Sequence, residues 1–200
     1  MANSIHYAAA YKNKIINLLL ANKDFIKLIN PEPSECNELD IVDVLIGGEW
    51  VINGKKWQEQ GHVFDHDFVD DTVVEQKTFV FVEADIDYID RGMFSDFTLY
   101  ICLFTAKELV RLTDESVPTP KEVKEMGCFA STTANRIDAL GEVIDRTING
   151  NKRIPGIGTV TPARQSYWKR YYPNNKYYGR SLAYNISNLC EDDFDGCGDF

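Results

Sequence analysis

The sequence predicts an α+β fold, in which a mainly antiparallel sheet is flanked by an N-terminal helix and a second amphipathic helix. Two apolar stripes of helical period, one near the N-terminus and one at residues 133–148, indicate the helices. Between and after them, several segments alternate with the period of strands. With 200 residues, the chain is long enough for one well-buried domain.

The N-terminal stripe predicts one amphipathic helix that stops before Pro31, since proline cannot continue a helix. Residues 30–72 follow as a polar, irregular insertion with strand-like pieces, IVDVLI and EWVI, and a turn signal at Asn53-Gly54. We expect this insertion to lie outside the centre of the sheet. The apolar positions of the predicted helix recur at steps of three and four: Ile15, Leu18, Leu19, Phe25, Ile26 and Ile29.

The strongest strand pattern lies in residues 73–89, VVEQKTFVFVEADIDYI, where apolar and other residues alternate. One face holds Thr78, Val80, Val82, Ala84 and Ile86, and the other holds Phe79, Phe81, Glu83, Asp85 and Asp87. The next segment, FTLYICLFT at 97–105, is apolar on both faces, as is typical of a central strand. The two segments predict a long antiparallel hairpin.

The second half of the chain predicts short helical pieces in AKELVRL and PTPKEVKEM, then a helix at 133–148. Two strands, GIGTVTPARQ and KYYGRSLAYNI, close the domain, and SYWKRYYPNN forms a loop between them. Residues 1–189 therefore form a single domain, and residues 190–200 form an acidic tail.

Charge is unevenly distributed along the chain. The net charge of −10 argues against general binding of nucleic acid, which is itself a polyanion. Between Arg146 and Leu189, however, there is no acidic residue and the charge is +8, so the rest carries −18. Two oppositely charged parts allow a chain to bind a copy of itself if they lie on opposite flanks. No apolar run is long enough to cross a membrane, and the five cysteines indicate no disulfide framework.

The stretch GHVFDHDFVDD, residues 61–71, is the strongest candidate for a metal site. A metal-dependent hydrolase would use His62, Asp65 and His66, and the three carboxylates of Glu83, Asp85 and Asp87 are an alternative for a nuclease. The alternation around the histidines favours an extended chain, in which residues four apart lie roughly 13 Å from each other. We therefore expect a surface or contact loop, with no metal, no cofactor and no catalytic residue.

The segment 166–180, SYWKRYYPNNKYYGR, interleaves basic and aromatic residues. Such residues can stack on bases and neutralise phosphates, and they also dominate contacts between proteins. The acidity of the whole chain favours a protein partner, with a nucleic-acid-binding module as the alternative. The candidate contact residues are Tyr167, Trp168, Arg170, Tyr171 and Tyr172.

The order of these segments resembles that of tail-completion and tail-terminator proteins of tailed bacteriophages. FTLYICLFT, RIDALGEVIDRTI and YYGRSLAYNI match the strand, the helix and the final strand of that family in order. The resemblance covers residues 73–189 and the first helix, while residues 30–72 have no counterpart in shorter members.

The resemblance implies a tail-terminator-like fold and a structural role rather than an enzymatic one. Copies of the chain, commonly six, would form a ring at the head–tail junction of the virion, beside neck, connector or tail-tube proteins. DNA would pass through the ring without being gripped, and Glu83, Asp85 and Asp87 are the candidates for the channel lining. The chain would be made in the cytoplasm of the bacterial host.

Overall fold

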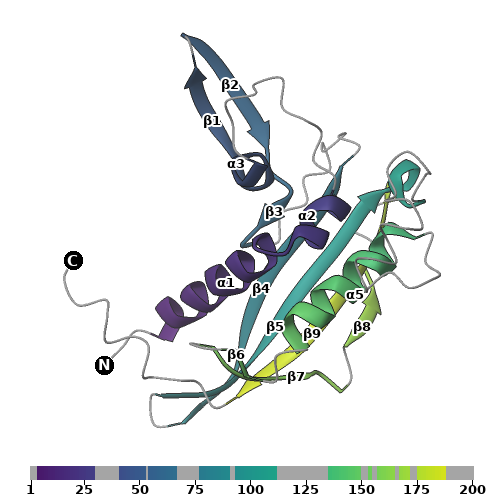
Figure 1. Cartoon of the computed structure of the whole chain (residues 1–200). Helices are drawn as coiled ribbons and strands as arrows, with labels where there is room; N and C mark the ends of the chain where they lie inside the picture. Colours follow the sequence, from purple (N-terminus) through teal and green to yellow (C-terminus); the bar gives the residue numbers. More distant parts are fainter. Residues whose placement is uncertain are drawn as a thin grey trace.

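The fold is seen in a computed structural model of the chain (Figure 1). It describes residues 4–29, 41–52, 54–66, 77–90, 93–111, 135–149, 153–154, 157–164, 167–171 and 175–187. The α+β class is confirmed, because helices pack on a sheet in which all strand pairs but one are antiparallel. None of the described helices is long and apolar enough to cross a membrane.

The main sheet has seven strands among the described residues. Its order is β3 (Val63–Phe64), β4 (Thr78–Asp90), β5 (Met93–Ala106), β9 (Tyr177–Ser187), β7 (Gly158–Pro162) and β6 (Arg153–Ile154), with β8 (Trp168–Arg170) paired to β9 beside β7. The predicted hairpin is confirmed as β4 and β5, whose register runs from the pair Thr78 and Thr105 to the pair Asp90 and Met93. The strand that is apolar on both faces, β5, therefore lies inside the sheet, between β4 and β9.

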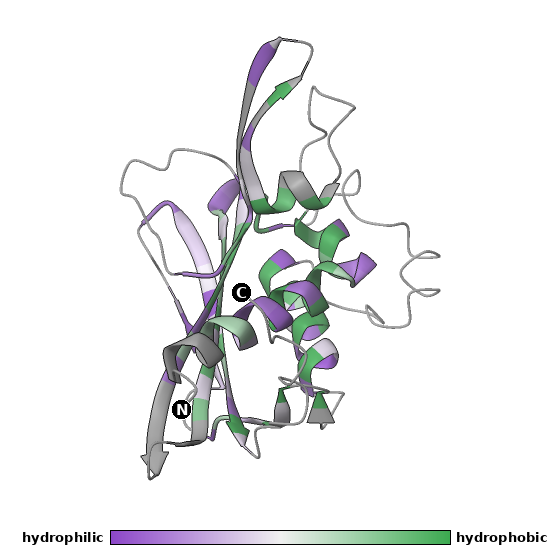
Figure 2. Ribbon diagram, turned by 90° about the vertical axis from the view of Figure 1, so that its left-hand side faces the viewer, coloured by the Kyte–Doolittle hydropathy of each residue, from purple (hydrophilic) through white to green (hydrophobic). Residues whose placement is uncertain are grey.

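Three helices pack on one face of this sheet: α1 (Ser4–Leu20), α2 (Lys23–Ile29) and α5 (Arg136–Asn149) (Figures 1 and 2). The apolar face predicted for the second helix is confirmed, since its five apolar residues are buried: Ile137, Leu140, Val143, Ile144 and Ile148. They pack against the helix-facing side chains of the strands, which include Val80, Val82, Leu99, Ile101, Leu103, Leu182, Tyr184 and Ile186. This contact is the main hydrophobic core.

The prediction of one N-terminal helix is wrong, because the chain breaks at Ala21 and Asn22 into α1 and α2. The side-chain oxygen of Asn22 accepts hydrogen bonds from the backbone N–H groups of Asp24 (2.9 Å) and Phe25 (3.3 Å). Asn22 therefore caps α2. Its side-chain amide also donates to the hydroxyl of Thr147 in α5 (2.8 Å), which fixes the break against the other helix.

Residues 41–46 correct a second prediction. IVDVLI forms a helix, α3 (Ile41–Ile46), instead of a strand, with Leu45 fully buried in the core. EWVI does form a strand, within the hairpin β1 (Gly47–Ile52) and β2 (Lys55–Gln60). Gly54 in the predicted turn has a φ of 76°, a conformation that glycine adopts at little cost.

The segment SYWKRYYPNN is not only a loop, because Trp168 to Arg170 form β8 on the edge of β9. Of the helical piece AKELVRL, the structure keeps a single 3₁₀ turn, η1 (Lys107–Leu109). PTPKEVKEM and the acidic tail lie outside the described residues.

Arg136, at the start of α5, joins three elements from a buried position. Its guanidinium donates to the backbone oxygens of Leu28 in α2 (2.7 Å) and Leu109 in η1 (3.0 Å). Burial lowers the pKa of this guanidinium. A cation at the C-terminal end of α2 also interacts favourably with the helix dipole.

Candidate interaction surfaces

The face of the sheet opposite the three helices is divided into an aromatic part and a polar part. Phe79 and Phe81 of β4, Phe104 of β5 and Tyr177 of β9 are buried together in a second apolar cluster. Further along β4, the same face carries Glu83 opposite Tyr100 and Asp85 opposite Thr98. We refer to this side as the helix-free face, since α1, α2 and α5 all pack on the opposite face (Figure 2).

The aromatic part of the helix-free face is tightly packed. The ring centroid of Phe104 lies 5.0 Å from that of Phe81, 5.2 Å from that of Phe79 and 5.3 Å from that of Tyr177. Phe64 of β3 adds a further ring, 5.3 Å from Phe81. Such ring pairs stabilise by about 0.5–1.5 kcal/mol beyond their area, so this end of the sheet is expected to be rigid.

The acidic part is more accessible to water. Glu83 is half-buried and forms an ion pair with Lys12 of α1 (3.5 Å), while Asp85 is exposed. Lys12 also donates to the backbone oxygen of Asp65 (2.5 Å), which ties α1 to the edge of the sheet. Asp87 lies where the pairing of β4 with β5 shifts register, and its side chain is outside the described ones. Two of the three predicted channel residues are thus placed on one face.

The predicted contact residues of segment 166–180 are distributed over both faces of the sheet. Trp168 packs against Gly141 of α5, where a larger residue would collide with the indole ring. Tyr171 packs beside Phe104 on the helix-free face, with ring centroids 6.1 Å apart. Arg170 is exposed, and Tyr172 lies outside the described residues. The aromatic side chains therefore hold β8 to the body, while the basic side chains of β8 itself are exposed.

Tyr167, the remaining member of that group, belongs to a hydrogen-bonded cluster with Tyr184 and Asp145. The Tyr184 hydroxyl donates to an Asp145 carboxylate oxygen (3.1 Å), and the Tyr167 hydroxyl also hydrogen bonds to Asp145. Burial, followed by the Asp145 charge, raises the pKa of Tyr184, and burial with the Asp145 hydrogen bond raises that of Tyr167. Both phenols stay neutral donors, so the cluster links β8, β9 and α5 structurally.

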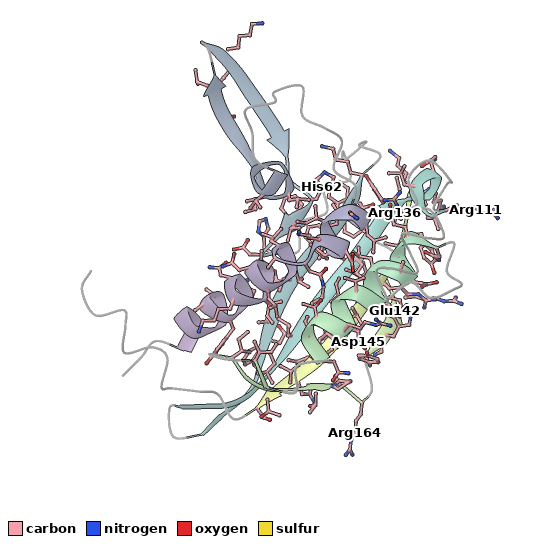
Figure 3. All side chains as sticks on the ribbon, in the orientation of Figure 1. His62, Arg111, Arg136, Glu142, Asp145 and Arg164 are labelled. Carbon is pink, nitrogen blue, oxygen red and sulfur yellow. The ribbon has the colours of Figure 1, made fainter. Side chains whose placement is uncertain are left out.

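Basic side chains gather around the start of β9, a group that we call the cationic end. It consists of Lys107, Arg111, Lys169, Arg170, Lys176 and Arg180. An open cavity of about 610 Å³ lies at this end, and two of the six cations line it. Its lining residues are Lys107, Glu108, Val110, Arg111, Asn175, Tyr177 and Tyr178. In Figure 3 the Arg111 side chain extends away from the body at this end. The arrangement favours an anionic partner.

Lys107 and Arg111 were missed by sequence reasoning, which considered only the basic stretch after Arg146. They join the cationic end because β5 and β9 are antiparallel, so that residues just after β5 meet those just before β9. The N–H of Lys107 donates to the backbone oxygen of Lys176 (3.1 Å). The sequence analysis predicted no pairing between the central strand and the last strand, so it had no signal that places these two residues here.

The two histidines of the candidate metal site lie in different environments. His62 is 2% exposed, and its Nδ1 lies 2.9 Å from the backbone oxygen of Thr78 (Figure 3). His66 is exposed, and its Nδ1 lies 2.7 Å from an oxygen of Asp65, which lowers the pKa of that carboxyl. Within the described ranges, no three potential ligands gather closely enough to hold a metal ion. Asp67, Asp70 and Asp71 lie outside those ranges.

The hairpin β1–β2 extends away from the body and directly follows α3 (Figures 1 and 2). We call the hairpin and α3 together the arm. Its register pairs Trp50 with Trp57. Val51 is 71% exposed and Ile46 is 50% exposed, and they are the two exposed large apolar residues of the described chain. An isolated two-stranded hairpin is marginally stable in water, so the arm has the properties of a contact element.

Comparison with models of protein families matches residues 15–186 to the family YomW. That family is associated with prophages, and its name comes from a Bacillus prophage gene. No curated protein and no solved structure matches the chain.

Proposed function

We propose that this chain, which belongs to the YomW family, is a structural protein of a phage particle. In this proposal its copies form a ring at the head–tail junction, as a tail terminator or tail-completion protein, and the genome passes through the ring. The family supports a phage-related origin. The fold supports a role in assembly, because its accessible features are the arm, the helix-free face and the cationic end.

The observation that carries the proposal is the arm. Val51 and Ile46 expose apolar surface on the arm, whose hairpin contacts mainly itself and α3 among the described residues. Exposed apolar residues on a projecting element are typical of a segment that is covered in an assembly. A closed ring needs two different surfaces on each copy, and the arm supplies one of them.

The helix-free face supplies the surface that we assign to the channel. Glu83 and Asp85 place carboxylates on it. Carboxylates repel the phosphates of DNA, so a lining of this kind lets the polymer slide without being held. No step of chemistry on a substrate is required of the chain.

The test is to block production of the chain in a phage that encodes it and to examine lysates by electron microscopy. We expect filled heads and separate tails, since the joint between them is missing, and rescue by the chain supplied from a plasmid. Complete, infectious particles made without the chain would contradict the proposal.

A point variant tests the arm within the same experiment. Val51→Asp adds a carboxylate at an exposed apolar site, and Asn17→Asp adds one at an exposed polar site of α1. Rescue by the Asn17 variant together with failure of the Val51 variant is the expected result. Equal rescue by both would remove the arm from the proposal.

A further inference from the structure

We propose that the acidic C-terminal segment of one copy, residues 188–200, binds the cationic end of a neighbouring copy. The partner is thus a second copy of this chain, and the ligand is an acidic peptide that also carries phenylalanine. This inference rests on the proposed function, because it names the contact that joins one subunit of the ring to the next.

The segment NLCEDDFDGCGDF is the most acidic part of the sequence. It holds five carboxylates, no lysine and no arginine, and so accounts for half of the net charge of −10. The five are Glu191, Asp192, Asp193, Asp195 and Asp199. Two phenylalanines, Phe194 and Phe200, lie among them. A receptor for this peptide needs cations beside aromatic surface.

The cationic end has both properties. Lys107 and Arg111 are exposed at the rim of the cavity, and Tyr177 and Tyr178 line it. A cavity of about 610 Å³ is within the size range of sites that hold a ligand of several side chains. The aromatic lining matches the phenylalanines, and the cations match the carboxylates.

The pairing of β8 with β9 gives a second reason to expect an anion here. Arg170 lies directly opposite Arg180 in that pair. Like charges in opposite positions of an antiparallel pair destabilise it. The Arg180 guanidinium lies 5.5 Å from the ring centroid of Trp168 and 6.0 Å from that of Tyr178, which is one of the residues that line the cavity. An acidic peptide would relieve the repulsion.

Geometry favours a neighbouring copy as the source of the acidic run 191–195. The cavity lies at Tyr177, where β9 begins, and the segment follows Ser187, where β9 ends. Ten residue steps of strand span roughly 33 Å. Asp195 is only eight residues beyond Ser187, a reach of at most roughly 29 Å for an extended chain. An extended backbone therefore leaves the run 191–195 short of the start of its own β9, and our proposal takes a neighbouring copy as its source.

A contact between opposite ends of two copies is head-to-tail, the type that closes into a ring when the rotation between copies allows it. DNA is the other polyanion that the cationic end could attract. The overall charge of −10 repels DNA at a distance. The acidic segment, in contrast, is attached to every copy, so its local concentration beside the cationic end of a neighbour is high. The observations therefore favour the peptide.

The experiment measures binding of a fluorescent synthetic peptide of residues 188–200 by fluorescence anisotropy. Its receptor is the full chain with a neutralised tail, which carries Glu191→Gln, Asp192→Asn, Asp193→Asn and Asp195→Asn. We expect saturable binding that weakens with salt and that weakens roughly tenfold when Lys107→Glu and Arg111→Glu are added. The matched control adds Lys23→Glu and Arg164→Glu, which reverse two other exposed cations, and leaves binding unchanged.

Lack of binding, or equal loss in both double variants, would overturn the inference. Stronger binding of a duplex DNA oligonucleotide than of the peptide would overturn it in favour of a nucleic-acid site. Native mass spectrometry of the neutralised full chain separates the two proposals. If the chain with the neutralised tail still forms rings, the proposed tail contact is refuted and the proposed ring stands. If the chain never forms rings but still binds the peptide, the contact stands and the proposed ring is refuted.

Discussion

The two faces of the sheet differ in the contacts that their side chains make. On one face, α1, α2 and α5 bury a continuous apolar core that includes Leu99 and Ile101. On the helix-free face, a compact aromatic cluster gives way to Glu83 and Asp85, which reach water. The helix-covered face holds the main apolar core, whereas the other face and the cationic end carry the accessible charges that our proposals assign to contact. Substitutions on the two sides should therefore have different consequences.

The largest effect is expected for Ile101→Ala on the helix-covered face. Ile101 is fully buried at the centre of β5, so truncation leaves a cavity beneath the helices. We expect a loss of about 2–5 kcal/mol in the free energy of unfolding, measured by urea denaturation. A loss below about 0.5 kcal/mol would show that the helices do not pack here as described.

Arg136→Met tests the link between the helices. The substitution keeps the apolar stem but leaves the backbone oxygens of Leu28 and Leu109 without their donor. We expect the free energy of unfolding to fall by about 2–3 kcal/mol, again by urea denaturation. An unchanged stability would contradict the joining role of Arg136.

Asn22→Ala removes the cap of α2 and its bond to Thr147. A cost of about 1 kcal/mol is expected, since alanine offers no acceptor to the first N–H groups of the helix. Asn17→Ala, at an exposed site within α1, is the control and should have almost no effect. Similar values for the two variants would argue that the break between the helices is not fixed by capping.

Asp85→Lys changes the helix-free face. Asp85 is exposed, so we expect the free energy of unfolding to stay within about 0.5 kcal/mol of that of the unsubstituted chain. In a phage that carries the substitution, infectivity should fall, because a cation on the channel lining holds phosphates. Normal infectivity with normal stability would exclude this face from the path of DNA.

The smallest effect concerns Asp65 and His66. The hydrogen bond from His66 lowers the pKa of Asp65. The pair therefore stabilises the fold at pH values above the ordinary carboxyl pKa of 3.8, and this stabilisation is lost as the pH falls below that pKa. Both side chains are exposed, so the contribution is below about 0.5 kcal/mol. In His66→Asn, NMR titration should show the Asp65 pKa rising. No rise would show that the bond does not form in solution.

Regular patterns predicted the elements that depend on a single local rule. The alternation in β4 and the apolar face of α5 led directly to the central hairpin and the covering helix. The sequence did not predict the break at Asn22, because the apolar stripe continues across it while the cap depends on one side chain. It also misread IVDVLI, where branched side chains favour a strand but Leu45 is buried as part of a helix.

The surfaces were predicted only in part, for a related reason. Glu83 and Asp85 share a face as the alternation requires. The cationic end depends on the pairing of β5 with β9, which brings Lys107 and Arg111 to Lys176 from far away in the sequence. The packing of Trp168 on Gly141 likewise depends on where β8 meets α5. Contacts of this kind follow from tertiary structure and leave no periodic signal.

The most direct test of the central claim, that the chain acts by assembling with copies of itself in a phage particle, is to locate and count it in purified virions. Electron cryomicroscopy of particles that carry a tagged chain, with quantitative mass spectrometry, gives both results. The account predicts several copies per particle in one ring at the head–tail junction. Infectious particles that contain no copy of the chain would contradict it.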